Sequence, residues 1–343
     1  MKRIAEEDLL HVLKHTQDVW NALRGKKIFI TGATGFFGKW LLESFVFANK
    51  ELSLNASVCA LSRNPELFLQ QYPFYKNEPS ITFIKGDVQH FTFPEGDFDF
   101  IIHAATDADA ALNKANPLQM LDTITLGTRR VLDFAKLQPN LQSFLFLSSG
   151  AVYGKQPESV THIQETDSFY LDINNPSSAY AEGKRVAELY CSTYFEKAAI
   201  PVKIARCFAF VGPYLPLDKH FAIGNFILDA INGNDIIIKG DGTPYRSYLY
   251  ASDLVIWLWV LLIKGVNNQP YNVGSDEDYS IREIAELVSS INDGIQINVI
   301  GKKTPGKPTE RYVPSIDLTK TKLSLDIYIK LADSIKKTIK FYE

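Results

Sequence analysis

Tyr180 and Lys184 stand four residues apart in the segment Tyr-Ala-Glu-Gly-Lys, so a helix would place both on one face. A cation beside a phenol stabilises the phenolate, and Tyr180 could then act as a general acid or base near neutral pH. Lowering a phenol pKa from about 10 to about 7 takes about 4 kcal/mol of differential stabilisation. Ser149, at the end of the apolar segment 143–149, can add a hydroxyl. We predict a proton-transfer site made of Ser149, Tyr180 and Lys184.

The spacing of this pair is weak evidence alone, because a chain of this composition contains about one Tyr-x-x-x-Lys by chance. Tyr72 and Lys76 share the spacing, but Pro73 lies between them and no strand ending in serine precedes them. We interpret that second pair as part of a surface loop. Tyr180 differs because a glycine-rich loop, the strand ending at Ser149 and a helix start precede it in that order.

The elements that position these side chains alternate between strand and helix from residue 26 to residue 206. Continuous apolar strands between helices are typical of a parallel sheet covered on both faces, so we predict a doubly wound α/β fold. The predicted strands are 26–31, 56–61, 81–85, 98–103, 143–149 and 202–206, and the predicted helices are 36–48, 117–136 and 178–197.

The alternation loosens after residue 206, which predicts a smaller lobe and a ligand cleft between it and the sheet. Its predicted elements are helices over 221–231, 254–264 and 280–291 and a strand over 236–239. Residues 6–24 form an amphipathic pattern that predicts one lead helix. We therefore predict a lead helix at 1–25, a cofactor domain at 26–205 to which 247–274 return, and a substrate lobe at 206–246 and 275–343.

Length and composition limit which class of protein this chain can be. The 343 residues, 46% hydrophobic and 22% charged, suit one large or two closely joined domains. A net charge of −3 gives no reason to expect nucleic-acid binding. The three cysteines and the His, Asp and Glu residues lack metal-ligand spacing, so we predict no metal site. With no leader pattern and no apolar stretch long enough for a bilayer, we predict a cytoplasmic protein without membrane segments.

The glycine-rich segment 31–38, Thr-Gly-Ala-Thr-Gly-Phe-Phe-Gly, follows the first predicted strand and opens the first helix. Glycines permit the tight turn and let the backbone approach a pyrophosphate at the helix N-terminus. The βαβ context makes the pattern specific, and it predicts a dinucleotide site. The residues expected to contact the cofactor here are Gly32, Thr34, Gly35, Phe36 and Phe37.

The end of the second strand distinguishes the two nicotinamide cofactors. An acidic side chain there would bind the adenosine ribose hydroxyls, whereas an arginine would pair with a 2′-phosphate. This chain has Ser62-Arg63, which favours NADP(H) and leaves NAD(H) as the alternative. Asp87, with Val88, could accept from the adenine amino group, and the segment Ala104-Ala105-Thr106 suits close backbone approach.

In this order the motifs resemble those of the extended short-chain dehydrogenase/reductases, the nucleotide-sugar-modifying NAD-dependent epimerase/dehydratase family. The resemblance spans about residues 26–320 and rests on 31–38, Asp87, 103–106, 148–154 and Tyr180 with Lys184. It implies a Rossmann domain, a catalytic triad of Ser149, Tyr180 and Lys184, Phe208 beside the nicotinamide, and a C-terminal lobe for a nucleoside-diphosphate sugar. It also implies a homodimer that pairs helices 117–136 and 178–197.

The resemblance also implies substrate contacts. Asn225, Arg246 and Arg311 match positions that hold the nucleotide diphosphate in relatives, and guanidinium groups suit phosphate oxygens. For Arg311 a surface charge is an equally good interpretation. The family usually has asparagine where this chain has Ala209, and the usual asparagine before Gly127 is also absent. Both changes affect the expected substrate geometry.

Two positions after Ser149 separate the reactions of the family. The 4,6-dehydratases have an Asp-Glu pair there, whereas this chain has Gly150 and Ala151, which transfer no proton. This argues against dehydration, and the decarboxylase branch is expected to be less similar for the same reason.

Three hypotheses about function stay open. The first is an oxidoreductase that moves a hydride at a sugar carbon, most simply C4, as a 4-keto reductase with Tyr180 as acid. The NAD-retaining 4-epimerase is its alternative. A non-catalytic Rossmann nucleotide sensor belongs to another class, and the intact Ser149, Tyr180 and Lys184 argue against it. The third hypothesis is a family member that acts on a small aldehyde, ketone or lipid.

Overall fold

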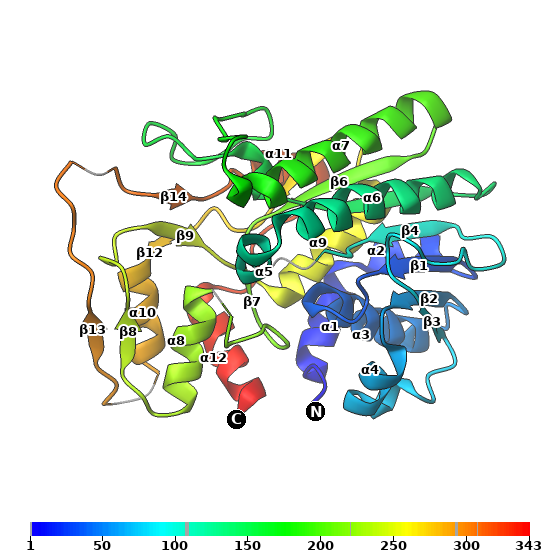
Figure 1. Cartoon of the computed structure of the whole chain (residues 1–343). Coiled ribbons are helices and arrows are strands. Elements are labelled where there is room, and N and C mark those ends of the chain that lie inside the picture. Colours follow the sequence, from blue (N-terminus) through cyan, green and yellow to red (C-terminus); the bar gives the residue numbers. More distant parts are fainter. Residues whose placement is uncertain (1, 107–109, 220, 292–293, 307) are drawn as a thin grey trace.

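The chain folds around a seven-stranded parallel sheet in the order β11-β6-β5-β4-β1-β2-β3 (Figure 1). The computed structural model describes residues 2–106, 110–219, 221–291, 294–306 and 308–343. The strands are β1 (Lys27–Thr31), β2 (Ser57–Ser62), β3 (Ile81–Lys85), β4 (Phe100–His103), β5 (Ser143–Ser149), β6 (Val202–Cys207) and β11 (Pro270–Val273). The strand order reverses between β1 and β4, and in such sheets ligands bind beyond the carboxyl ends of the strands at that point.

Helices cover both faces of this sheet, as the continuous apolar strands predict. One face holds α6 (Pro117–Lys136) and α7 (Ala179–Ala198), and the other holds α3 (Phe36–Glu51) and α9 (Ala251–Lys264). Every residue of β5 is buried between them. The doubly wound α/β fold is therefore confirmed. The shorter helices α4 (Pro65–Gln71) and α5 (Ala110–Ala115) follow β2 and β4.

A smaller lobe, on the left of Figure 1, carries three small sheets. These pair β8 with β13, β12 with β9 and β14, and β7 with β10. Its elements are β7 (Phe210–Val211), α8 (Ala222–Ile231), β8 (Ile236–Ile238), β9 (Tyr245–Ser247), β10 (Leu249–Tyr250), β12 (Asp278–Ser280), α10 (Ile281–Ser289), β13 (Ile297–Val299), β14 (Arg311–Tyr312), α11 (Asp317–Leu323) and α12 (Leu331–Tyr342).

The chain crosses between the two lobes more than once. After the first small strands it returns through α9 to β11, which joins the main sheet beside β6. Ser280 caps α10 and forms a reciprocal capping box with Glu283. The expected domain boundaries, with 247–274 returning to the cofactor domain, stay a proposal.

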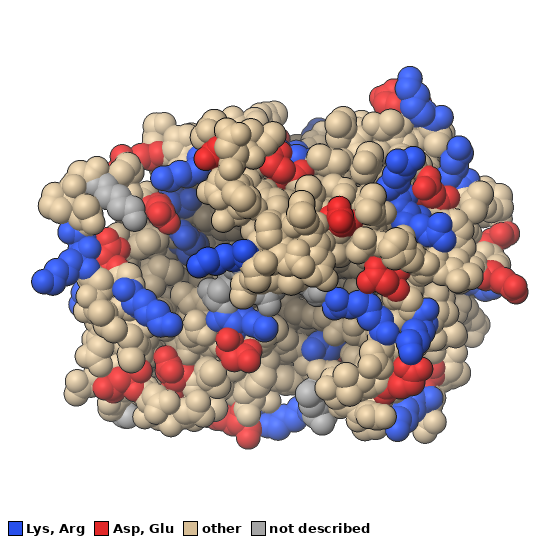
Figure 2. Space-filling view, in the orientation of Figure 1, with Lys and Arg blue, Asp and Glu red and all other residues tan. Residues whose placement is uncertain are grey.

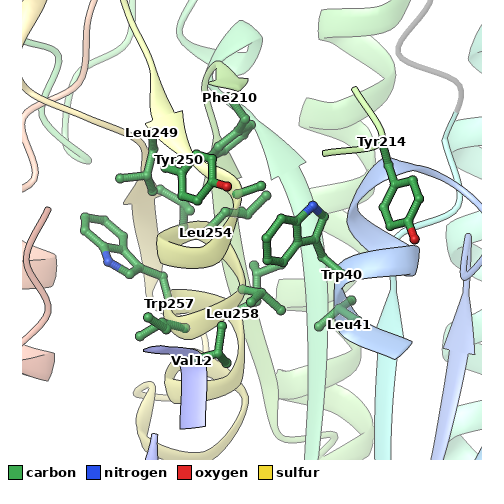
Figure 3. Close-up of a cluster of buried hydrophobic side chains, with 14 of the residues drawn as sticks. Val12, Trp40, Leu41, Phe210, Tyr214, Leu249, Tyr250, Leu254, Trp257 and Leu258 are labelled. Carbon is green, nitrogen blue, oxygen red and sulfur yellow. The ribbon is translucent and has the colours of Figure 1, made fainter. Parts of the chain in front are cut away.

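The lead segment is not one helix, so the prediction of a single helix over 6–24 is wrong. It consists of α1 (Glu6–His15), α2 (Gln17–Trp20) and the short helix Asn21–Leu23. The break falls at Thr16, whose hydroxyl donates to the Val12 carbonyl at 2.5 Å and accepts from the Trp20 indole at 2.7 Å. The segment still packs on the core, because Val12 belongs to the same buried cluster as Trp257 (Figure 3).

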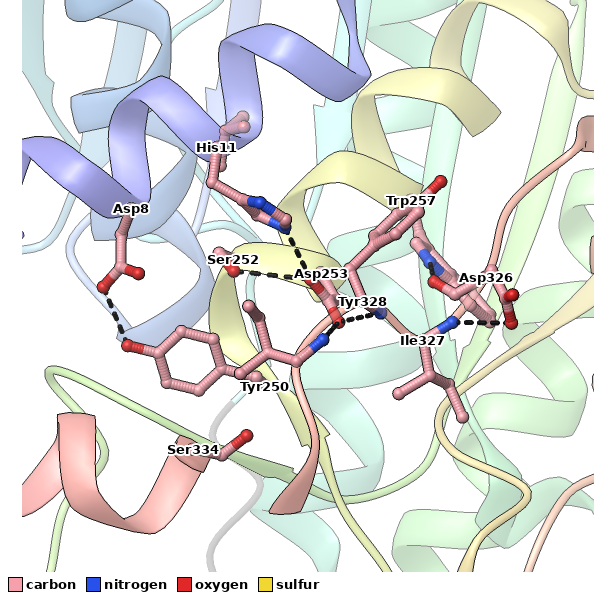
Figure 4. Close-up of polar contacts among 12 residues, drawn as sticks. Asp8, His11, Tyr250, Ser252, Asp253, Trp257, Asp326, Ile327, Tyr328 and Ser334 are labelled. Carbon is pink, nitrogen blue, oxygen red and sulfur yellow. Dashed lines mark hydrogen bonds and ion pairs between the residues drawn. The ribbon is translucent and has the colours of Figure 1, made fainter. Parts of the chain in front are cut away.

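Polar contacts join α1 to α9 and to the chain just before α12 (Figure 4). Asp253, fully buried on α9, accepts from the amides of Tyr328 and Ile329 at 2.8 and 2.9 Å and lies 3.2 Å from the His11 ring nitrogen. The Tyr250 hydroxyl donates to Asp8 at 2.8 Å. The two ends of the chain are thereby held against one helix of the core.

Candidate active site

The glycine-rich loop between β1 and α3 approaches the backbone at the end of β4. Gly32 has a φ of +72°, and a Cβ there would lie 2.5 Å from the Ala104 carbonyl carbon. A Cβ on Gly38 would overlap the Ala33 carbonyl, so α3 starts directly against the loop. Gly35 is the N-cap of α3 and has no side chain to cover the first-turn amides. These features fit a dinucleotide pyrophosphate at the helix N-terminus.

The other loop residues predicted to bind the cofactor are half-buried. This holds for Thr34, Phe36 and Phe37. The Phe37 ring packs edge-on against Phe210 with 5.1 Å between ring centres, which ties the loop to the smaller lobe. The loop is therefore fixed from both lobes.

The predicted residues beyond β2 and β3 lie at the same edge of the sheet. Ser62 is buried at the end of β2, and Arg63 is exposed directly after it. Asp87 accepts from the amide two residues further on at 2.9 Å, which shapes the turn after β3. Val88 packs against α6, because its Cγ1 would lie 2.8 Å from a Cβ on Gly127. In the described structure Val88 is part of the core as well as a neighbour of Asp87.

A chain of hydrogen bonds under the loop fixes the end of β4. The Thr31 hydroxyl lies 2.7 Å from His103 Nδ1 and accepts from the Ala105 amide at 3.2 Å. On its other side, His103 Nε2 lies 3.0 Å from the Thr128 hydroxyl. Burial, with a smaller effect from the Lys184 charge, lowers the pKa of His103 to about 3. His103 is thus a neutral structural residue, and it holds the backbone that the cofactor would approach.

Lys184 lies buried between the ends of β4 and β5. Its ammonium donates to the Thr106 hydroxyl at 3.1 Å and to the Leu147 carbonyl at 2.8 Å, and it lies 4.9 Å from the centre of the Phe146 ring. Burial lowers the pKa of Lys184 to about 8. The predicted Thr106 and Lys184 are therefore brought together, and these contacts hold the ammonium in place.

Tyr180 and Ser149 also meet, as the sequence predicts. Burial raises the pKa of Tyr180 to about 12, and the smaller effect of the Ser149 hydroxyl acts in the opposite direction. Lys184 is not among the groups that shift this pKa. We expected Lys184 to lower the Tyr180 pKa towards neutrality, and the described residues do not lower it. As it stands, the site keeps the phenol protonated, and a protonated phenol is a proton donor.

Tyr312 is a residue of this site that the sequence analysis missed. A Cβ on Gly150 would lie 2.5 Å from the Tyr312 hydroxyl, and the Tyr312 ring packs on Phe208 with 4.7 Å between centres. Phe208 is predicted to lie beside the nicotinamide, and its ring also packs near that of Tyr153, with 6.0 Å between ring centres. The only sequence signal for Tyr312 is its position next to Arg311, together with a glycine at position 150 that leaves space near Ser149.

A cavity of about 680 Å³ opens in the smaller lobe between α8 and the segment around β8. Asn225 lines it, together with Lys219, Lys239, the turn at 240–244 and Ile281. In Figure 2 a hollow lies on this side of the molecule, and lysine and arginine side chains surround it. Its size and partly apolar lining suit a ligand the size of a nucleoside.

Arg246 and Arg311 lie on the neighbouring strands β9 and β14, one register step apart. Arg246 is 3.8 Å from the Glu310 carboxylate, and Arg311 forms an ion pair with Asp278. The Arg311 guanidinium also lies 4.1 Å from the centre of the Tyr245 ring. The two predicted diphosphate contacts are thus close together, and each guanidinium has a carboxylate partner.

The second Tyr-Lys pair lies elsewhere, and its surroundings differ from the expectation. Tyr72 is buried, so the surface-loop interpretation is wrong for it, whereas Lys76 is exposed. The Tyr72 hydroxyl accepts from Lys39 at 3.0 Å, and its ring packs on Phe68. Apolar packing at α4, rather than chemistry, accounts for Tyr72.

Within the described ranges, no three His, Cys, Asp or Glu side chains come together as metal ligands would. The described helices include none with the length and apolar character that a bilayer crossing requires.

Sequence comparison gives the family. A model described as "NAD dependent epimerase/dehydratase family" matches residues 28–274. UDP-glucuronic acid decarboxylase 1 of Xenopus tropicalis is 30% identical over 321 residues, which are 92% of this chain and 72% of that protein. The decarboxylases were expected to be the less similar branch, and this similarity contradicts that expectation.

Solved structures show the same fold at lower identity. An epimerase from Methanothermobacter thermautotrophicus superposes with a TM-score of 0.80 at 22% identity, covering 96% of both chains. The UDP-glucose 4-epimerase of Thermotoga maritima, solved with UDP-glucose, gives 0.77 at 18% identity, covering 92% of this chain and 98% of the other.

Proposed function

This chain belongs to the NAD dependent epimerase/dehydratase family of nucleotide-sugar-modifying enzymes, and we propose that it is a 4-keto reductase of a nucleoside-diphosphate sugar. The observation that carries the proposal is the chemistry around Tyr180. Burial raises the pKa of Tyr180 to about 12 and keeps the phenol protonated, and Gly150 and Ala151, directly after Ser149, carry no acid or base. A protonated phenol and hydroxyl groups can protonate an oxygen, whereas Gly150 and Ala151 supply no proton transfer for dehydration.

In this proposal Tyr180 donates its proton to the C4 oxygen of the sugar as the carbonyl becomes an alcohol. Ser149 donates a hydrogen bond to the same oxygen and stabilises the charge that develops there. Lys184, held by Thr106 and the Leu147 carbonyl, binds the cofactor ribose and adds a positive charge close to the reaction. A bound nicotinamide cofactor would supply the hydride. Solvent then returns a proton to Tyr180.

The smaller lobe would bind the nucleotide part of the substrate. The cavity beside Asn225 is large enough for a nucleoside, and Lys219 and Lys239 at its border favour an anionic ligand. Arg246 and Arg311 would hold the diphosphate between this cavity and Ser149. Since each now pairs with a carboxylate, binding requires the phosphate oxygens to compete with Glu310 and Asp278.

For the cofactor we propose NADP(H), with NAD(H) as the alternative. The family description names NAD, while Arg63 stands exposed just beyond the end of β2, where a 2′-phosphate would lie. Measured dissociation constants for NADPH and NADH distinguish the two.

We further propose a homodimer through α6 and α7. Both helices expose large apolar side chains to solvent: Leu118 at 73%, Leu126 at 45% and Leu189 at 65%. Light scattering on the purified protein would give the mass of a dimer, and Leu189→Glu should reduce it. The three cysteines are free thiols, which supports the proposal of a reducing, cytoplasmic compartment.

The test is incubation with UDP-, dTDP-, GDP- and CDP-sugars and their 4-keto derivatives, following NAD(P)H absorbance and product mass. The proposal predicts NADPH oxidation with a 4-keto substrate and a product two mass units heavier. An enzyme purified with tightly bound NAD that interconverts C4 epimers without consuming NADPH would contradict the reductase and support the epimerase. Release of CO₂ from UDP-glucuronic acid would contradict both. If free nucleoside diphosphates give no thermal stabilisation, the substrate class is wrong.

A further inference from the structure

One carboxylate on α7 contacts the strand that carries the predicted serine, and it has no part in the proposed reaction. Glu188 lies eight residues after Tyr180 and four after Lys184, so the three side chains share one side of the helix. On that side Lys184 donates to the Leu147 carbonyl at 2.8 Å. One residue further along β5, Ser148 donates to the Glu188 carboxylate at 2.5 Å. Consecutive residues of β5 therefore hold consecutive turns of α7.

The same carboxylate also binds the next strand. Arg206 lies opposite Ser148 in the pairing of β5 with β6, and it donates to Glu188 from Nε at 3.1 Å and from Nη2 at 2.7 Å. Both side chains of this ion pair are largely buried, at 14% and 13% exposed. The remaining guanidinium nitrogen donates to the Glu165 carbonyl at 2.9 Å, so the arginine is held in place from a second side. A pair that uses two guanidinium nitrogens fixes direction as well as distance. Glu188 thus joins α7 to β5 and β6 at one point.

The charge of Glu188 also acts on Lys184. Burial lowers the pKa of Lys184 to about 8, and the groups that act in the opposite direction are Cys207, Glu188 and Cys191. Burial raises the pKa of both thiols, that of Cys207 to about 12, so neither is charged at neutral pH. On β4, His103 is neutral as well. Glu188 is therefore the carboxylate in this set, and a negative charge favours the ammonium over the neutral amine.

We propose that Glu188 is a positioning residue, whose carboxylate fixes α7 on β5 and β6 and so holds the Lys184 ammonium in place beside Thr106, where the cofactor ribose would bind. This role rests on the proposed binding of the cofactor by Lys184, and it does not depend on which sugar is reduced. Glu188 acts through Lys184, and no proton is transferred to or from it in the cycle.

The pH dependence of cofactor binding tests the charge. The dissociation constant of NADPH, or of NADH if that binds more tightly, is measured by fluorescence titration from neutral to alkaline pH. In wild type it should rise as Lys184 loses its proton, at about pH 8. Glu188→Gln keeps the shape and removes the charge, so the rise should begin about one pH unit lower. An unmoved rise would overturn the proposal. Burial also lowers the pKa of Lys39 and Lys203 to about 8, but Glu188 is not among the groups that act on them, so their contributions cancel in the comparison.

Glu182→Gln is the matched control. Glu182 lies on the same helix and also pairs with an arginine, Arg185 at 3.2 Å, but it is not among the groups that act on Lys184. The control should therefore keep the wild-type pH of the rise. A shift as large as that of Glu188→Gln would show that the loss of any carboxylate on α7 has this effect, and it would overturn the specific role of Glu188.

Two milder variants test the position and keep the charge, and they decide if Glu188→Gln fails to fold because the buried Arg206 is left unpaired. Ser148→Ala removes the link to β5, and Glu188→Asp draws the carboxylate back by one methylene. Each should raise the dissociation constant of the cofactor about fivefold at neutral pH, because Lys184 is held less firmly, and leave the pH of the rise unchanged. A lower Tm with unchanged cofactor binding would reduce Glu188 to a structural residue and overturn the proposal. If all variants behave as expected but wild type converts no sugar nucleotide, the proposed function fails and this inference stands.

Discussion

Replacing His103 by glutamine should make the stability of this protein less sensitive to acid. Burial lowers the pKa of His103 from its ordinary 6.5 to about 3, and the Lys184 charge contributes in the same direction. Above pH 6.5 the imidazole is neutral in both the folded and the unfolded chain, so it adds no pH dependence. Between pH 6.5 and pH 3 the unfolded chain binds a proton that the folded chain refuses, and the folded state loses stability as the pH falls.

The size of the effect follows from the shift. Each pH unit below 6.5 costs about 1.4 kcal/mol of unfolding free energy, so His103 alone accounts for ~2 kcal/mol between pH 7.5 and pH 5. Glutamine does not titrate, and its amide can replace one of the contacts to Thr31 and Thr128. His103→Gln should therefore be less stable at pH 7.5 but lose about 2 kcal/mol less than wild type on acidification.

The assay is urea denaturation of both proteins at pH 7.5 and pH 5. The difference between the two proteins in their loss of unfolding free energy cancels the contributions of the other titrating groups. One of these is His15, whose pKa burial also lowers. Parallel losses in wild type and His103→Gln would refute the account of His103 as a buried neutral residue. Unequal m-values would show instead that the denatured states differ.

Two further predictions concern the cofactor and the N-terminal helix. Arg63→Gln should raise the dissociation constant of NADPH about tenfold, because it removes one charge-assisted contact with the 2′-phosphate. The dissociation constant of NADH should stay within twofold, and a fluorescence titration measures both. A parallel change for the two cofactors would contradict the 2′-phosphate contact. Asp253→Ala should lower the unfolding free energy by ~3 kcal/mol, because it leaves the partly buried amides of Tyr328 and Ile329 without their acceptor. His11→Ala removes only a partly exposed partner of the same carboxylate and should cost less than about 1 kcal/mol, so equal losses in urea denaturation would argue against the amide contacts.

Strong periodicity made the main sheet predictable. The apolar runs that became β1 to β6 lie between helices with clear starts, such as Pro117 at the first turn of α6. The smaller lobe was harder because its strands β7, β9, β10, β12 and β14 are only two or three residues long. So few residues show no alternation, and the pairing of β14 with β9 depends on tertiary contacts. The break at Thr16 also escaped prediction, because a threonine bonded to the Val12 carbonyl looks like an ordinary helical residue in sequence.

The site was predictable where order and spacing carried the information. Ser149, Tyr180 and Lys184 come together because one ends β5 and the others share a face of α7. The partners of Lys184 and the pKa of Tyr180 depend on burial, which no spacing reveals. Tyr312 was missed for a similar reason, since only the path of β14 across the smaller lobe brings it to Gly150 and Phe208.

The most direct test of the central claim is the turnover of Tyr180→Phe. With a 4-keto sugar nucleotide and NADPH, loss of the proton donor should reduce kcat by about 10²- to 10⁴-fold, while the dissociation constant of NADPH stays within twofold. The buried neighbour Cys207 keeps its packing, because phenylalanine fills nearly the same space. A Tyr180→Phe protein that oxidises NADPH at the wild-type rate would contradict the assignment of Tyr180 as the acid, and with it the proposed reaction.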